Sequence, residues 1–110
     1  ADPRKPKTAE VRRQAEQGGR FWLYNTALNY SCVMLVADAI ERAASTDRAK
    51  VLEALASSTF ADHIMPYGPT RFVNGQNTGA APVNTQVQDR DIKVIFPAEF
   101  ADASTVFPAT

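Results

Sequence analysis

A chain of 110 residues has room for one small domain. Its twelve basic and twelve acidic side chains give no net charge. Six Lys or Arg fall within residues 1–20, but no aromatic side chain is interspersed with them, so the composition does not favour nucleic-acid binding. The single cysteine, Cys32, excludes an internal disulfide and a cysteine-based metal site.

The beginning of the chain combines a proline-rich stretch with a helical pattern. Residues 1–7 are predicted to form a stiff, solvated lead-in, because their two prolines favour extended backbone. They do not have the pattern of a signal peptide, so we expect a chain that is mature, truncated or never exported. Residues 8–17 are good helix formers, with Thr8 in the position of an N-cap. The narrow apolar side of this segment predicts a surface helix that depends on tertiary packing.

Large apolar and aromatic side chains follow one another in residues 20–26. One interpretation is a core plug or a short strand. The other is the wall of an apolar pocket, in which Phe21, Trp22 or Tyr24 holds a small ligand through aromatic bulk and a polar tip. The sequence alone does not choose between these interpretations.

Residues 27–57 are predicted to form a helical hairpin. Apolar residues recur with helical spacing in the first half, so we expect the face that includes Val33 and Ile40 to be buried. This apolar stretch is interrupted by polar residues and is shorter than the roughly 20 residues of a membrane span. Ser45-Thr46-Asp47 is expected to end the first helix and cap the second, and Leu52 is expected to point into the shared interior.

Residues 65–96 combine turn residues with alternating strands. Asn74-Gly75 is predicted to reverse the chain through a turn that needs positive φ. Residues 83–88 and 92–96 alternate apolar and polar side chains, which predicts a β-hairpin. The C-terminal tail, residues 97–110, holds further apolar side chains, and we expect it to pack on other residues, which can belong to a part of the protein outside this sequence.

The sequence shows no pattern of catalytic or metal-binding residues. His63 is the only histidine and lacks the further ligands that zinc needs, so a surface or hydrogen-bonded role is expected. No Ser-His-Asp arrangement, carboxylate pair or glycine-rich phosphate loop can be assembled. We therefore expect that the protein is not an enzyme and that it binds neither a metal nor a cofactor. A pocket that joins His63 to Asp62 is the arrangement that would favour an enzyme instead.

Three segments in order carry a resemblance to a known family: YSCVMLVADAIERAASTD, VLEALASSTF and MPYGPTRFVNGQNTGAAPVNTQVQDRDIKVIFPAEF. Together they resemble the C-terminal third of periplasmic substrate-binding proteins of branched-chain amino-acid-type ABC transporters, the leucine/isoleucine/valine-binding protein family. The most specific part is PYGPTRFVNGQNTGAAPVNTQVQ followed by IKVIFP. The resemblance implies an α/β fold, a partial lobe of a type I periplasmic binding protein, with two or three helices and a short β-hairpin or strand set.

The resemblance also implies a function in transport. It implies an extracytoplasmic, periplasmic component that captures an amino acid or a related small polar ligand non-covalently by lobe closure. The implied partners are this ligand and the membrane permease of the transporter, with no nucleic acid. Because family members are considerably longer, we expect residues 1–110 to form a single partial domain, a C-terminal fragment.

The resemblance assigns candidate ligand contacts to the residues just before and at the start of the central helix. These are Tyr24 and Asn25, with Phe21 and Trp22 as second candidates. The identity of the ligand does not follow from these residues. The alternative function is a structural interaction module that binds no ligand of its own and self-associates into homo-oligomers through exposed apolar surface.

Overall fold

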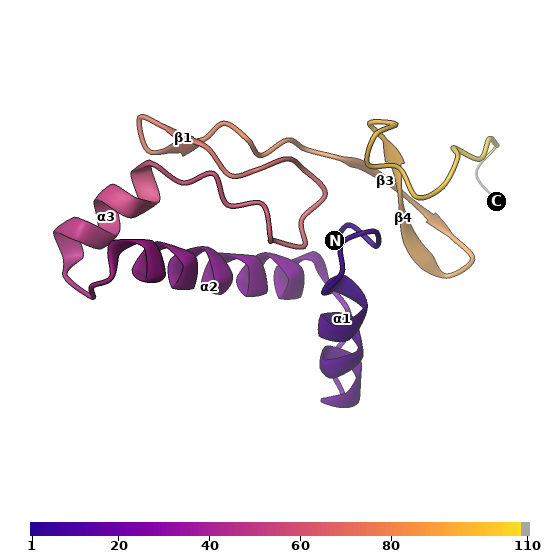
Figure 1. Cartoon of the computed structure of the whole chain (residues 1–110). Helices are drawn as coiled ribbons and strands as arrows, with labels where there is room; N and C mark the ends of the chain where they lie inside the picture. The colour runs from indigo at the N-terminus through magenta and orange to yellow at the C-terminus, as the bar shows by residue number, and fades with distance from the viewer. Residues whose placement is uncertain (109–110) are drawn as a thin grey trace. The chain divides into compact units, whose positions relative to one another are not determined.

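The structure, a computed structural model, describes residues 1–108, which form three α-helices and two small antiparallel strand pairs (Figure 1). This mixed α/β composition confirms the predicted fold class. The chain divides into two compact units, Ala1–Ala80 and Ala81–Thr110, where the sequence predicts a single partial domain. The division follows from local bonding, because the C-terminal hairpin and tail hydrogen-bond with each other.

The helices of the first unit are α1 (Thr8–Gln17), α2 (Tyr24–Ala43) and α3 (Arg48–Ala56). α1 has the predicted bounds, and α2 and α3 pack as the predicted helical hairpin. α2 ends where Ala44 adopts a left-handed conformation with φ 47°. α1 contacts α2 near the start of α2, and α3 lies at the other end of that helix (Figure 1).

Asp47 caps the start of α3, as the sequence predicts. Its Oδ1 accepts hydrogen bonds from the backbone N–H groups of Ala49 and Lys50, at 3.1 and 3.2 Å. These two donors would otherwise lack a partner within the helix.

We expect Asp47→Ala to lower the free energy of unfolding of the first unit by about 1 kcal/mol, because it removes both capping bonds. Urea denaturation followed by circular dichroism measures this change. Asp38→Ala is the matched control, since it removes only an (i, i+4) ion pair with Arg42 on α2, worth about 0.3 kcal/mol. Equal losses in the two variants would contradict the capping role.

The first unit also contains a two-stranded hairpin, formed by β1 (Phe72–Val73) and β2 (Gln76–Asn77). Asn74 and Gly75 connect the strands with φ values of 50° and 77°, which confirms the predicted turn. The sequence predicts no strand after this turn, but Gln76 pairs with Val73 in an antiparallel register.

The second unit is built on the hairpin of β3 (Asn84–Gln88) and β4 (Asp91–Phe96), as the alternation of residues predicts. Val87 lies opposite Ile92, and both side chains are exposed. The connecting residues Asp89 and Arg90 both have positive φ, the geometry of a tight two-residue turn.

The C-terminal tail packs on this hairpin through side-chain bonds. The amide of Gln86 accepts from the backbone N–H of Val106 at 2.9 Å and donates to the carbonyl of Val106 at 2.8 Å. Val94 N–H donates to the Asp102 carboxylate at 2.7 Å, and Val94 is buried. The last two residues of the predicted tail, 109 and 110, lie outside the described residues.

The interior of the first unit is small and largely polar. Its buried hydrophobic side chains are Ala27, Ala39, Ala54 and Ile64. Its buried polar side chains are Asp2, Thr8, Ser31, Ser58, His63 and Thr70. Within residues 1–108, no buried side-chain nitrogen or oxygen lacks a hydrogen-bond partner. Hydrogen bonds therefore hold much of this interior together.

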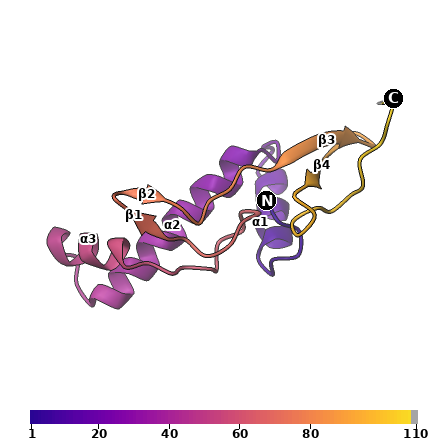
Figure 2. The same ribbon diagram turned by 90° about the horizontal axis from the view of Figure 1, so that it is seen from above.

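The prediction of the buried face of α2 is wrong at Val33 and Ile40. Val33 is 67% exposed, Ile40 is also exposed, and on α3 the predicted interior residue Leu52 is 64% exposed. α2 instead buries its small side chains, and the segment between α3 and β1 runs back along the helix (Figures 1 and 2). Small side chains allow this close approach, whereas the larger apolar side chains remain uncovered. No helix among residues 1–108 is both long and apolar enough to cross a membrane.

Candidate functional site

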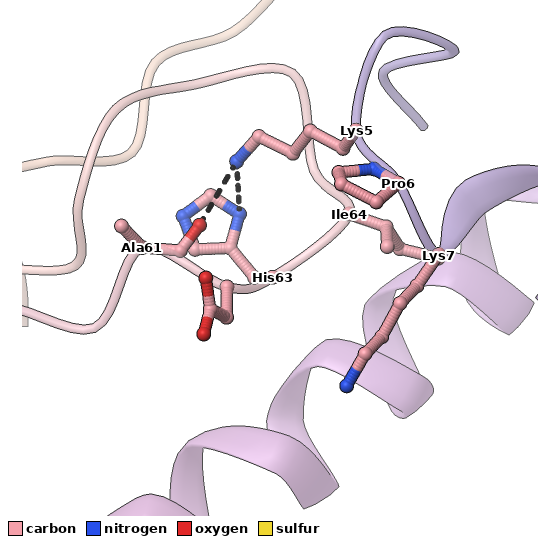
Figure 3. Close-up of a pocket in the computed structure, with 7 residues that line it drawn as sticks. Lys5, Pro6, Lys7, Ala61, His63 and Ile64 are labelled. Atoms are coloured by element: carbon pink, nitrogen blue, oxygen red, sulfur yellow. Dashed lines mark hydrogen bonds between the residues drawn. The ribbon is translucent and has the colours of Figure 1, made fainter.

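A cluster of polar contacts in the first unit surrounds the His63 imidazole, which comes from the segment between α3 and β1. His63 is only 2% exposed. Its Nδ1 lies 3.0 Å from Lys5 Nζ (Figure 3). Its Nε2 lies 2.9 Å from the carbonyl oxygen of Gly68. Lys5 reaches this position from the N-terminal segment, just before α1.

The partners of His63 define its protonation. A carbonyl oxygen only accepts hydrogen bonds, so Nε2 must carry the proton that is donated to Gly68. Nδ1 then accepts, both from the Lys5 ammonium and from the backbone N–H of Met65 at 3.3 Å. The neutral imidazole with its proton on Nε2 is therefore the form that satisfies these partners.

Lys5 places its ammonium among three acceptors. Besides His63 Nδ1, these are the carbonyl oxygens of Ala61 and Tyr67, both 3.4 Å from Nζ. An ammonium has three N–H donors, so these acceptors match its full capacity. Burial lowers the pKa of Lys5, although the nearby carboxylates of Asp2 and Asp62 oppose this change.

The N-terminal segment, residues 1–7, is anchored, so the prediction of a solvated lead-in is wrong. Asp2 is buried, and its backbone N–H donates to the carbonyl of Ile64 at 2.8 Å. The Thr8 hydroxyl donates to the carbonyl of Asp2 at 2.6 Å. Thr8 is therefore not the predicted N-cap of α1. Lys7 occupies that position without a side-chain cap.

The Asp2 carboxylate is occupied by Arg4, whose backbone N–H and Nε each donate to Oδ1 at 3.0 Å. Burial alone would raise the pKa of Asp2, but the hydrogen bonds and charge of Arg4, with the charge of Lys5, hold that pKa below its usual value. The Asp2 carboxylate therefore stabilises the conformation of the N-terminal segment.

Two aromatic rings lie beside the imidazole. The ring of Tyr67 is 4.6 Å from that of His63 between centroids, and the ring of Phe60 is 6.2 Å away. Burial lowers the pKa of His63, and the Lys5 ammonium lowers it further, while the Gly68 carbonyl and the Asp62 carboxylate act in the opposite direction. The surroundings favour the neutral imidazole.

A cavity of about 190 Å³ adjoins this cluster, lined by Lys5, Pro6 and Lys7 on one side and by residues 61–64 on the other (Figure 3). It brings His63 and Asp62 to one place, the arrangement that would favour an enzyme. However, both imidazole nitrogens already bond to protein groups, so neither is free to take a proton from a substrate. Among residues 1–108, no group of three or more His, Cys, Asp or Glu is arranged to hold a metal ion.

The residues that the resemblance assigns to ligand binding lie elsewhere, on the link to α2 and in its first turn. Phe21 is 85% exposed and Tyr24 is 72% exposed, so Phe21 is not a core plug in this chain. Asn25 is exposed and Trp22 is half-buried. None of these four side chains lines the cavity beside His63 or the second described cavity, which lies between α1 and Tyr30.

The sequence does not indicate that Lys5 is the partner of His63. The two residues are 58 positions apart, and a single lysine in a polar segment has no pattern that identifies a distant acceptor. Of the two roles expected for His63, at the surface or in hydrogen bonds, the structure shows the second, since the side chain is buried and both ring nitrogens are bonded. Comparison with known proteins finds no matching family model and no matching curated protein.

Proposed function

We propose that the chain is part of an extracytoplasmic solute-binding component of an ABC transporter, specific for amino acids or a related small polar ligand. The ligand is captured non-covalently by closure of two lobes, in the periplasm, and is delivered to a membrane permease. The proposal rests on the resemblance of three ordered segments to the branched-chain amino-acid-type receptors. The order of a helical hairpin followed by turns and paired strands is consistent with a partial lobe of that kind.

The structural observation that carries this proposal is the uncovered apolar surface of the helical hairpin. Large apolar side chains of α2 and α3 are exposed, among them Leu28, Val33, Val36, Ile40 and Leu52. Monomeric soluble proteins rarely leave large contiguous apolar areas in water. In the proposed receptor, further parts of an α/β lobe cover this surface.

The chemistry of the candidate site supports binding rather than catalysis. His63 and Lys5 are engaged with each other and with backbone carbonyls, so neither imidazole nitrogen is free to act as a general base at the cavity. Tyr24 and Asn25 are exposed at the first turn of α2 and are available to a ligand held against a second lobe. We therefore propose them as ligand contacts, with Phe21 and Trp22 beside them.

Isothermal titration calorimetry on the complete product of the gene and on the 110-residue chain tests this proposal. Leucine, phenylalanine and glutamine serve as aliphatic, aromatic and amide probes. We expect the complete product to bind at least one of them with one-to-one stoichiometry, and the 110-residue chain to give no measurable heat. A complete product that binds none of these probes would contradict the proposal.

The assignment of Asn25 has its own control within α2. Asn25→Ala is expected to weaken binding by the complete product at least about 10-fold, which corresponds to 1.4 kcal/mol. Asn29 is also exposed on α2, one turn further along, and Asn29→Ala should leave the affinity unchanged. Equal affinities for the two variants would remove Asn25 from the ligand site.

The uncovered face of α2 also supports the second candidate, a module that self-associates. In that case light scattering on the 110-residue chain gives a mass above that of a monomer, and Val33→Asp restores the monomer. Val87→Asp, at an exposed position of the second unit, serves as the control and leaves the mass unchanged. A monomeric chain with a cooperative thermal transition would count against this candidate.

A further inference from the structure

We propose that the contact between Lys5 and His63 is a pH-sensitive clasp, which holds the N-terminal segment (residues 1–7) at neutral pH and releases it when the imidazole is protonated. This inference is independent of the proposed function, since it depends only on contacts within the first unit.

The clasp joins two segments that are far apart in sequence. Lys5 Nζ bonds to His63 Nδ1 and to the carbonyls of Ala61 and Tyr67, so one side chain connects the N-terminal segment to the segment between α3 and β1 at three points. Close by, the Asp2 N–H donates to the carbonyl of Ile64. Loss of the Lys5 contacts therefore weakens the attachment of residues 1–7 directly beside this backbone bond.

Protonation of His63 removes the acceptor on which the clasp depends. The added proton occupies Nδ1, because Nε2 already carries the proton donated to Gly68. Nδ1 then faces two donors, the Lys5 ammonium and the Met65 N–H, without a lone pair for either. Protonation also gives the imidazole a positive charge, with Nδ1 about 3.0 Å from the charged Lys5 Nζ. The ammonium must move away, and its bonds to Ala61 and Tyr67 are lost with it.

The charged and titratable groups around the imidazole come from both segments. The N-terminal segment contributes Lys5, while Asp2 is engaged by Arg4 and Lys7 lines the adjoining cavity. The segment between α3 and β1 contributes Asp62 and the neutral Tyr67 ring, next to which Cys32 of α2 lies. Of these groups, Asp62 favours the protonated imidazole, and it is itself exposed. Burial and the Lys5 charge oppose protonation, so the clasp is closed at neutral pH.

The direction of the pH effect follows from the lowered pKa of His63. The unfolded chain binds a proton near the ordinary value of 6.5, whereas the folded chain binds it only at lower pH. The contribution of His63 to stability is therefore complete above pH 6.5 and is lost as the pH falls from 6.5 toward the folded pKa. The pKa of Asp2 is lowered from 3.8, so its contribution is lost only at still lower pH.

Nuclear magnetic resonance on the full 110-residue chain between pH 8 and pH 4.5 tests the clasp. The imidazole nitrogen shifts of His63 report its protonation, and hydrogen exchange of the Asp2 amide reports the attachment of the N-terminal segment. After correction for the intrinsic pH dependence of exchange, we expect protection of Asp2 to fall with the midpoint of the imidazole titration, below pH 6.5. The amides of Ala49 and Lys50, which bond to Asp47, should keep their protection throughout.

Two variants distinguish the clasp from general acid unfolding. His63→Asn keeps an acceptor near the position of Nδ1 but does not titrate, so the loss of Asp2 protection over this pH range should disappear. Lys5→Met keeps the aliphatic side chain and removes the charge, so the midpoint of His63 should rise and Asp2 should be poorly protected at every pH. If His63→Asn does not fold, the midpoint of the His63 titration in Lys5→Met distinguishes the clasp from general acid unfolding. An unchanged midpoint, an imidazole that stays neutral to pH 4.5, or constant Asp2 protection through the titration overturns the proposal.

Discussion

Ile64→Ala is expected to lower the free energy of unfolding of the first unit by about 2–5 kcal/mol, which is the range for truncation of a buried Ile or Leu. Ile64 is 1% exposed and is the largest fully buried side chain among the described residues. Its backbone also joins three segments. Its N–H donates to Ser31 of α2 at 3.3 Å, and its carbonyl accepts from Asp2. A cavity at this position therefore weakens the place where the N-terminal segment, α2 and the segment before β1 meet.

Chemical denaturation followed by circular dichroism measures the effect of Ile64→Ala. Leu52→Ala is the matched control, since it removes a side chain of equal size from a position that is 64% exposed. We expect the control to change stability by no more than about 0.5 kcal/mol. The conservative variant Ile64→Val should lose about 0.5–1.5 kcal/mol. If Leu52→Ala cost as much as Ile64→Ala, the position of the core described above would be wrong.

Gly79→Ala is the second substitution with a large expected effect, a loss of about 1–3 kcal/mol or more in the free energy of unfolding. A Cβ added at Gly79 would overlap the carbonyl oxygen of Pro69. It would also lie 3.1 Å from the carbonyl carbon of Pro69 and 3.3 Å from the backbone nitrogen of Arg71. These are backbone atoms, so relief of the overlap requires the two chain segments to separate.

Separation of these segments would also disturb the hydrogen bonds that flank β1 and β2. The Asn77 carboxamide accepts from the backbone N–H groups of Arg71 and Gly79, at 3.1 Å each, and Thr78 N–H donates to the carbonyl of Arg71 at 2.7 Å. Gly68→Ala is the control, because a Cβ at Gly68 meets no atom within 4 Å. The same denaturation measurement should separate the two variants clearly, and similar losses would mean that the approach of Gly79 to Pro69 is not maintained in solution.

The sequence predicted those parts of the fold that depend on neighbouring residues. Asn74-Gly75 specified its turn because both positions need positive φ, and the alternation around β3 and β4 specified their pairing. The cap of α3 followed in the same way, since Asp47 bonds to amides only two and three residues away.

Features that depend on distant partners could not be predicted. α2 carries apolar side chains on more than one side, so the buried face is decided by what packs against the helix and not by its own pattern. Thr8 has the residue type of an N-cap, but its hydroxyl donates to Asp2 instead. The candidate site was missed for the same reason, because Lys5 and His63 meet only when the N-terminal segment folds back onto residues 61–67.

The polar interior of the first unit has a consequence for its response to temperature. The heat capacity of unfolding rises with the apolar area that becomes exposed and falls with the polar area, and averages about 12–15 cal/mol/K per residue in globular domains. Here three alanines and Ile64 are the buried hydrophobic side chains, beside six buried polar ones. The heat-capacity change of unfolding per residue should therefore lie below that average. A small heat-capacity increment flattens the stability curve, so the unit should keep nearly the same modest stability over a broad range of temperatures, with little tendency to unfold in the cold.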